Sequence, residues 1–331
     1  MILAGDVGGT NTRLAFFEPR SGGFAERWQG KFPSREAADL SELLRRAREE
    51  SGLVASAACI GIAGPIEDGR ATATNLPWQV DSRDVARTLG ISSALLLNDL
   101  EATAFGIAML ADDALHTLLA GEARAGNAGI LAAGTGLGQA GLFWDGARHR
   151  PFACEGGHAD FAPGDELEAR LYLWLRERHG HVSWERVLSG PGLVNLRDFL
   201  REEEHLPPAQ DIEGDDAAAI TQAADRGDAL ATRALAAFVR LYGRAAGNVA
   251  LAYLARGGIY LAGGIAPKIL PWLERPAFRA GFLAKGRLAS FLEGVPVRVV
   301  LEDRTAVYGA ARAAALELGI CDEDTCRIVR A

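Results

Sequence analysis

The chain has 331 residues, and at about 150 residues per domain this length predicts two domains. Hydrophobic residues make up 49% and charged residues 24%, with a formal net charge of −8, which is typical of a globular protein and excludes a disordered one. No apolar run reaches the roughly 18 residues that span a bilayer. An acidic chain without a basic block argues against nucleic-acid binding. We therefore expect neither a membrane nor a nucleic acid as partner.

The cysteine content indicates a reducing compartment. The four cysteines, Cys59, Cys154, Cys321 and Cys326, show no CxxC spacing, which argues against a disulfide scaffold and against a zinc site. The first residues, MILAGDVGG, have no basic flank before the apolar stretch, so no signal peptide is predicted. We expect a cytoplasmic protein.

The N-terminal part begins with two predicted strands. Residues 2–7 and 12–17 are apolar, and the turn at 8–11 between them contains the Gly and Asn residues that suit a tight hairpin. A helix is predicted over 35–49, because its leucines share one face, with Ser34 as the N-cap. These elements start an alternation of strands and helices that predicts an α/β fold.

The alternation continues through the middle of the chain. Buried strands are predicted at 54–62 and 94–97, and a helix at 99–110 follows the second of them. Residues 128–133 and 139–144 are two more predicted strands around a second glycine-rich turn.

Helices predominate from about residue 165 onward. The longest is predicted from about 228 to 255, with Leu235, Phe238, Tyr242 and Val249 on one stripe. The final elements are listed in chain order: strand 258–262, strand 296–301 and helix 305–317.

Two segments far apart in the chain share one pattern. GDVGGTNTRLAFF (5–17) and AAGTGLGQAGLFW (132–144) each read as a strand, a turn of Gly and Thr, and a second strand that ends in aromatic residues. This similarity between the two segments predicts two domains with related cores, each with a glycine turn that faces a shared cleft.

The 39 glycines are clustered, and the clusters could bind phosphate. A turn rich in Gly exposes backbone N–H groups that can surround phosphate oxygens. Neither turn matches the P-loop pattern GxxxxGK[ST], and the first is followed by a strand, unlike a dinucleotide fingerprint. Either turn alone can be an ordinary hairpin turn. A third site, Gly263 and Gly264 at the end of the strand 258–262, favours a nucleotide, because a flat ring can lie against such backbone.

Candidate polar residues lie next to these glycines. Asp6 precedes the first turn and could hold Mg²⁺, directly or through water. Asn98 and Asp99 join a predicted strand to a helix; Asp99 is either a helix N-cap or a general base at the carboxyl end of the strand.

A second polar group has the pattern Glu155-Gly-Gly-His158. Its carboxylate and imidazole could hydrogen-bond vicinal hydroxyls, or the segment could be a structural turn. A metal site would need more ligands; His149 is near in sequence, but no HExxH pattern supports it. Spacing alone makes Glu185 a helix-dipole partner in the first turn of a short helix, with a ligand carboxylate as the alternative.

Six segments carry a family resemblance. GDVGGTNTRLA, LLLNDLEATAFGI, AAGTGLG, EGGHADFAP, ERVLSGPGLVNL and LAGGI, in this order, closely resemble bacterial glucokinases of the hexokinase-like group, in the actin-like ATPase (ribonuclease H-like) superfamily. The resemblance covers about residues 5 to 315. EGGHADFAP and ERVLSGPGLVNL are specific to this group, whereas GDVGGTN is shared by many sugar kinases.

The resemblance implies a two-domain α/β fold of mixed sheets with flanking helices and a ligand cleft between the domains. It implies domains of 1–109 plus 299–331 and of 110–298, because the helix 305–317 resembles the closing helix that returns to the N-terminal domain. It also implies a glycolytic homodimer that transfers phosphate from ATP, with Mg²⁺, to the 6-hydroxyl of glucose.

The family's site residues carry over by position. Asp99 matches the catalytic base. The positions that match sugar-binding residues are Asn98, Asp99, Glu155, His158 and Glu185. The positions that match nucleotide-binding segments are Gly5, Asp6, Val7, Gly8, Gly9, Thr10, Asn11, Gly134, Thr135, Gly136, Gly138, Gly263 and Gly264. Asp6 would serve Mg²⁺ through water.

Some features depart from related families, and alternatives stay open. No cysteine follows His158 before Cys321, so the zinc motif of the related repressor–kinase family is not expected. The acidic stretch 211–216 is interpreted as a solvated loop. The alternatives are a kinase for another hexose such as fructose or mannose, a donor other than ATP such as polyphosphate or ADP, and a non-catalytic sugar sensor. An actin-like or chaperone-like ATPase would have no use for the Asn98, Glu155 and His158 set.

Overall fold

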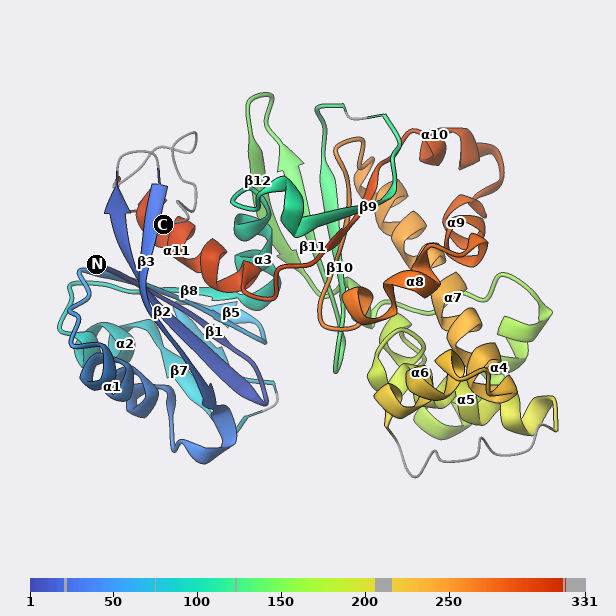
Figure 1. Cartoon of the computed structure of the whole chain (residues 1–331), viewed down its shortest axis with the longest axis horizontal. Helices are drawn as coiled ribbons and strands as arrows, with labels where there is room; N and C mark the ends of the chain where they lie inside the picture. Colours follow the sequence, from blue (N-terminus) through green and yellow to red (C-terminus); the bar gives the residue numbers. More distant parts are fainter. Residues whose placement is uncertain (21–22, 75, 123, 206–215, 318, 320–331) are drawn as a thin grey trace. The chain divides into compact units, whose positions relative to one another are not determined.

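The computed structural model describes residues 1–20, 23–74, 76–122, 124–205, 216–317 and 319. The chain divides into two compact units: unit 1 is Met1–Ala114 with Glu302–Ala331, and unit 2 is Leu115–Leu301. Unit 1 is therefore built from both ends of the chain, the blue and red ends of Figure 1. Cys321, Cys326 and the acidic stretch 211–216 apart from Asp216 lie outside the described residues. No helix of the described part is long and apolar enough to cross a bilayer.

Unit 1 contains a five-stranded mixed sheet. Its strands are β1 (Ile2–Val7), β2 (Asn11–Arg20), β3 (Gly23–Pro33), β4 (Ala57–Ile62) and β8 (Leu95–Asn98). Their order is β3-β2-β1-β4-β8. The first three form an antiparallel meander, and β1, β4 and β8 are parallel. A separate small sheet comprises β5 (Ile66–Glu67), β6 (Arg70–Thr72) and β7 (Gln79–Asp81).

Helices cover both faces of this sheet. Side chains alternate along a strand, so Leu3 packs in a cluster with residues of α1 (Leu40–Ser51) and α2 (Ser82–Leu89). Ile2 belongs to the other cluster, which residues of α11 (Thr305–Glu317) complete.

Two glycines bring α3 (Asp99–Ile107) and α11 unusually close together. A Cβ added at Gly309 would lie 1.7 Å from the backbone oxygen of Ala102, and one at Gly106 would lie 2.0 Å from that of Thr305. Backbone cannot yield as a flexible side chain can, so only glycine fits at either position.

Replacing Gly309 by Ala is expected to lower the free energy of unfolding by about 2–3 kcal/mol, because the methyl group forces α11 away from α3. Chemical denaturation measures this loss. Gly294→Ala is the matched control, since its Cβ would meet Phe291 O at an ordinary 3.5 Å. Equal stability of the two variants would contradict the predicted clash.

Unit 2 contains a six-stranded mixed sheet of the order β12-β11-β10-β13-β14-β9. The strands are β9 (Leu115–Leu119), β10 (Ala128–Ala133), β11 (Leu137–Trp144), β12 (His149–Cys154), β13 (Gly258–Ala262) and β14 (Val297–Val300). As in unit 1, a three-stranded antiparallel meander is followed by parallel strands. The shared sequence pattern of 5–17 and 132–144 therefore reflects the same hairpin in both sheets.

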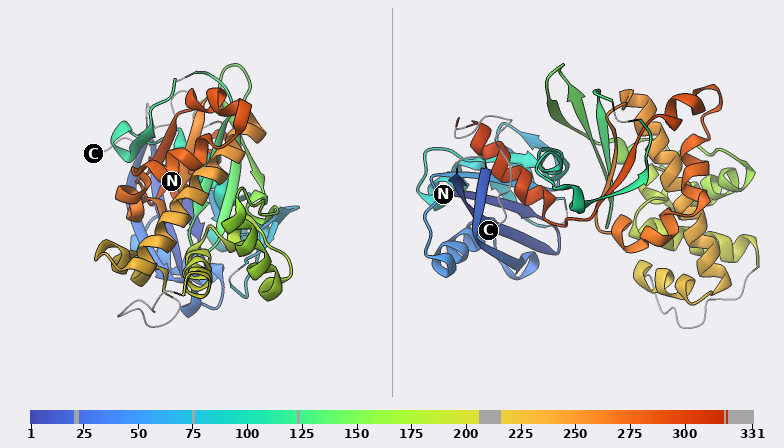
Figure 2. Two further views of the ribbon diagram at one scale, coloured as in Figure 1. Left: turned by 90° about the vertical axis from the view of Figure 1, so that its right-hand side faces the viewer. Right: turned by 45° about the horizontal axis from the view of Figure 1, so that its top comes forward.

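The helices of unit 2 pack around one long helix, α7 (Ala229–Tyr253). The predicted stripe on α7 is buried. The other helices are α4 (Glu166–His179), α5 (Gly190–Glu203), α6 (Ala217–Asp225), α8 (Leu270–Leu273), α9 (Pro276–Leu283) and α10 (Ala289–Glu293). Both views of Figure 2 agree with Figure 1 that α9 lies beside α7, where Gly243 faces the backbone of Phe278.

One predicted helix begins elsewhere. The helix expected over 35–49 is α1, and its N-cap is Asp39, whose carboxylate accepts the N–H of Glu42 at 2.8 Å. The prediction of Ser34 as N-cap is wrong. Ser34 is fully buried at the end of β3 and forms a 3₁₀ turn with the next two residues, so its side chain points into the protein rather than along a helix.

Candidate active site

The first glycine turn, residues 8–11, joins β1 to β2 in unit 1. The N–H of Gly8 donates to Asn11 O at 3.0 Å. Among the described residues, the N–H groups of Gly9 and Thr10 have no hydrogen-bond acceptor. Two backbone donors at a glycine turn are therefore available to an anion, as the sequence predicted for a phosphate segment.

The three residues of β1 before this turn, Gly5, Asp6 and Val7, face opposite sides of the sheet in alternation. Val7 is buried in the cluster under α1, and a Cβ at Gly5 would meet Ile60 and Leu14 at 2.7 and 2.8 Å. These two positions serve packing. Asp6 points to the opposite face of the sheet because side chains alternate along β1.

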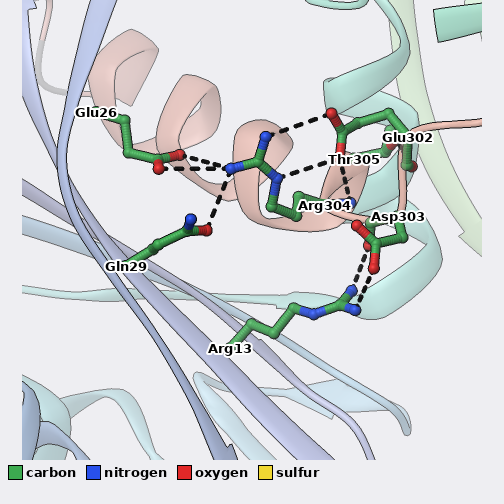
Figure 3. A network of polar contacts seen from close by, with 7 residues as sticks. All are labelled: Arg13, Glu26, Gln29, Glu302, Asp303, Arg304 and Thr305. Carbon is green, nitrogen blue, oxygen red and sulfur yellow. Dashed lines mark hydrogen bonds and ion pairs between the residues drawn. The ribbon is translucent and has the colours of Figure 1, made fainter.

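Asp6 lies in a charged cluster. Its cross-strand partner in β2 is Arg13, whose guanidinium binds both the backbone oxygen and the carboxylate of Asp303 (Figure 3). The pKa of Asp6 is raised to about 6, mainly by burial and next by the carboxylate of Asp99; Arg13 opposes the shift and Asp303 adds to it. The carboxylates of Asp99 and Asp303 thus disfavour the charged form of Asp6, which a nearby cation would stabilise.

Replacing Asp6 by Asn is expected to stabilise the metal-free protein at pH 8 but not at pH 4. Because the pKa in the folded state is raised, protonation of Asp6 favours folding, and this contribution is lost as the pH rises from about 4 to about 6. Thermal unfolding in a chelator-containing buffer at both pH values tests this. A difference between variant and parent that does not change with pH would contradict it.

A second ion-pair network ties β3 to the start of α11. The Arg304 guanidinium donates to the Glu26 carboxylate at 3.1 Å, to Gln29 Oε1 at 3.2 Å and to Glu302 Oε1 at 3.2 Å (Figure 3). Beside it is a cavity of about 420 Å³, whose lining includes Lys31. No sequence pattern indicates this network, because Glu26 and Gln29 are distant in the chain from Glu302 and Arg304.

Asn98 and Asp99 lie where β8 ends and α3 begins. Asn98 is the N-cap: its Oδ1 accepts the N–H of Leu100 at 2.9 Å, and its Nδ2 donates to Gly64 O at 3.2 Å. The alternative that Asp99 is the cap is therefore wrong, although Asp99 Oδ1 also accepts the Leu100 N–H at 2.9 Å. The carboxylate of Asp99 lies at the carboxyl end of a parallel strand, where α/β sheets bind ligands.

The second glycine turn joins β10 to β11 in unit 2 and is held from two sides. Within the turn, the Gly134 N–H donates to Gly136 O at 2.9 Å. From outside it, the Gly190 N–H at the start of α5 donates to Gly134 O at 2.8 Å. In the part of the chain that the structure describes, the N–H groups of Thr135 and Gly136 have no acceptor. Gly138 lies further along in β11, opposite Ala132.

Glu185 contacts this turn directly. Its Oε2 accepts the N–H of Leu137 at 2.9 Å, and a Cβ at Gly136 would lie only 2.5 Å from the same oxygen. The interpretation of Glu185 as a helix-dipole partner is wrong, because its helical segment is a single 3₁₀ turn, η4 (Trp184–Arg186), and the carboxylate reaches out of it.

Glu155, His158 and Glu185, which the family resemblance implies to be sugar-binding residues, are brought together in unit 2. His158 lies on the 3₁₀ turn η3 (Gly156–His158). Its Nε2 is 3.8 Å from Glu155 Oε2, and its Nδ1 is 4.0 Å from Glu185 Oε1. A Cβ at Gly157 would lie 1.9 Å from Leu137 O, so the turn needs glycine to approach the strand. The result is a group of two carboxylates and an imidazole beside a glycine turn, with Glu155 and His158 exposed and Glu185 half-buried.

The third glycine pair lies next to the second turn. Gly263 has φ +80°, and its Cβ would lie 2.4 Å from Ala133 O. The Ile265 N–H donates to that same oxygen at 3.2 Å, while a Cβ at Gly264 would have open space. Unit 2 thus joins the predicted phosphate and adenosine segments at Ala133.

Comparison with known proteins identifies the family of the chain. A sequence model of the family described as Glucokinase matches residues 3–317. The chain belongs to the glucokinase family.

The relatives resemble the chain over nearly its full length. It is 38% identical to the glucokinase of Nostoc punctiforme over 337 residues, 95% of this chain and 99% of the relative. The solved glucokinase from an Antarctic psychrotroph is 31% identical with a TM-score of 0.83, covering 95% of this chain and 98% of that one. A ROK family glucokinase from Streptomyces griseus, in complex with glucose and AMPPNP, shares the fold at 20% identity and a TM-score of 0.65, covering 95% and 99%. The predicted actin-like α/β fold of the glucokinase family is confirmed.

Proposed function

We propose that the chain transfers the γ-phosphoryl group of ATP to the 6-hydroxyl of D-glucose, giving glucose 6-phosphate and ADP. Membership of the glucokinase family supports the reaction, and the AMPPNP complex of the Streptomyces griseus enzyme supports ATP as donor. The observation that carries the proposal is the hydrogen bond from the Leu137 N–H to Glu185. It links a proposed sugar-binding carboxylate to the end of the second glycine turn, which is the proposed phosphate-binding turn of unit 2.

Asp99 is the proposed catalytic base. Phosphoryl transfer depends on positioning and charge stabilisation, and an aspartate that accepts the proton of the attacking hydroxyl is the usual base. The two bonds of Asn98 fix the helix start, so the Asp99 backbone is held in place. The carboxylate would orient the 6-hydroxyl and take its proton as the bond to the γ-phosphorus forms.

Glu155, His158 and Glu185 would form hydrogen bonds with the sugar hydroxyls. Asn98 is the further residue expected to bind the sugar. A carboxylate accepts hydroxyl hydrogens and an imidazole N–H donates to a hydroxyl oxygen. A site built to bind particular hydroxyls penalises a sugar that lacks them. Glucose is the expected hexose because the matching family and the relative from Nostoc punctiforme are described as glucokinases.

The two glycine turns would bind the phosphates through the N–H groups of Gly9, Thr10, Thr135 and Gly136. Such prepositioned donors stabilise the charge that develops during transfer. Gly263 and Gly264 would lie against the adenosine.

Asp6 would hold Mg²⁺ through water. The described residues include no group of three or more side chains able to hold a metal ion by themselves. Mg²⁺ that arrives with ATP needs only one or two carboxylates besides the phosphates, and the carboxylates near Asp6 fit this requirement. When bound, Mg²⁺ would neutralise phosphate charge.

The domain bounds 1–109 plus 299–331 and 110–298, the homodimer, the cytoplasmic location and a place in glycolysis stay predictions for this chain. They are implied by the family resemblance of the sequence.

A coupled assay of glucose 6-phosphate tests the proposed function. The purified chain is first given glucose with ATP, ADP, polyphosphate or no donor, and glucose 6-phosphate is measured. It is then given ATP with glucose, mannose or fructose, and the release of ADP is measured, because each hexose gives a different sugar phosphate. Product with ATP and the highest kcat/KM for glucose are expected. Faster turnover with another donor or another hexose would replace ATP or glucose in the proposal.

A further inference from the structure

We infer that Ser34 is a positioning residue that holds the first phosphate turn in its binding conformation. The inference rests on the proposed function, because it assigns to that turn a nucleotide phosphate. Ser34 follows β3, and the register that pairs Asn11 with Pro33 brings it beside the turn at 8–11. It is completely buried.

Ser34 makes two hydrogen bonds to the turn. Its backbone N–H donates to Thr10 O at 3.0 Å, and its hydroxyl donates to Gly8 O at 2.7 Å. Both bonds engage carbonyl oxygens of the turn. The Gly8 carbonyl and the Gly9 N–H belong to one planar peptide and point in opposite directions, so the bond to Gly8 O turns the Gly9 N–H away from Ser34 and leaves it for a ligand.

A third contact completes a chain of hydroxyls. Thr12 Oγ1 lies 2.9 Å from Ser34 Oγ, and both side chains are fully buried. The hydrogen of the Ser34 hydroxyl is used at Gly8 O, since a carbonyl can only accept. Thr12 is therefore the donor to Ser34, and the bond to Gly8 is polarised by the one behind it.

This arrangement prepares the turn before the nucleotide arrives. A flexible glycine turn would have to be ordered on binding, at a cost in affinity. With two carbonyls held by Ser34, the donors keep one geometry. The turn of unit 2 has the matching device, since Gly190 and Glu185 hold it from outside.

The test compares three variants by AMPPNP affinity, steady-state kinetics and thermal unfolding. Ser34→Ala removes the hydroxyl that binds Gly8, and Ser34→Cys nearly keeps the volume but donates weakly. Thr12→Val is the matched control. It removes the other buried hydroxyl of the hydrogen-bonded series Thr12–Ser34–Gly8, yet it leaves the bond from Ser34 to Gly8 O in place. Direct binding of AMPPNP needs no turnover, so a loss here is distinct from a failure of the proposed reaction.

Both Ser34 variants are expected to raise the Kd of AMPPNP and the KM of ATP about fivefold or more, with the KM of glucose within about twofold of the parent. Thr12→Val is expected to lose similar thermal stability but to keep the ATP values within about twofold. Unchanged AMPPNP affinity in Ser34→Ala, or an equal loss of affinity in Thr12→Val, would overturn the inference.

Discussion

Replacing Asp99 by Asn is expected to lower kcat about 10³-fold, because a positioned general base contributes about 10²- to 10⁴-fold. The side chain keeps its size and can still accept the Leu100 N–H, so α3 and the fold should survive. The KM of glucose should change much less than kcat. Coupled detection of glucose 6-phosphate and circular dichroism measure the two effects.

Asp84→Asn is the control for this variant. Asp84 is an exposed carboxylate of the same unit, in α2, where it pairs with Arg87 at 2.8 Å. Its replacement is expected to leave kcat unchanged. An Asp99→Asn enzyme with more than about a tenth of the parent kcat would show that another group takes the proton.

The second large effect is expected for Glu185→Ala. This change removes a proposed sugar acceptor and also the acceptor of the buried Leu137 N–H. At about 1.5–3 kcal/mol for each charge-assisted bond, the kcat/KM for glucose should fall about 10²- to 10³-fold or more. Initial rates over a range of glucose concentrations give the value.

Asp160→Asn provides the comparison. Asp160 is a carboxylate two residues after His158, and its side chain is largely exposed. Its Oδ1 lies 2.9 Å from His181 Nε2. It should keep the parent kcat/KM. Equal losses in both variants would mean that negative charge near the site, rather than the two contacts of Glu185, sets the rate.

The sequence alone was sufficient for the buried strands and the glycine turns. The strands β4, β10 and β13 are continuous apolar runs, and β1 is interrupted only by Asp6, because these strands are covered on both faces. The three glycine segments at strand ends could be located from the sequence, and their binding of a nucleotide stays a prediction. The family-specific segments around Glu155 and Glu185 supported the activity.

The edge strands β3, β9 and β12 were not predicted. Each has a neighbour on one side only and is partly exposed over much of its length, so no continuous apolar run marks it. Their pairing is decided by the neighbouring strand. The missed strand β3 is the reason that Ser34 was interpreted as a helix cap.

The sequence by itself determined the α/β class, the central strands, the glycine turns and the candidate base, because these depend on local composition and on short motifs. Only the tertiary structure decided that Asn98 caps α3, that Glu185 binds the Leu137 N–H, and that Ser34 holds the first turn. The physical reason is the same in the last two cases. A hydrogen bond between residues far apart in the chain exists only after strand pairing and helix packing have brought them together, and no local pattern records it.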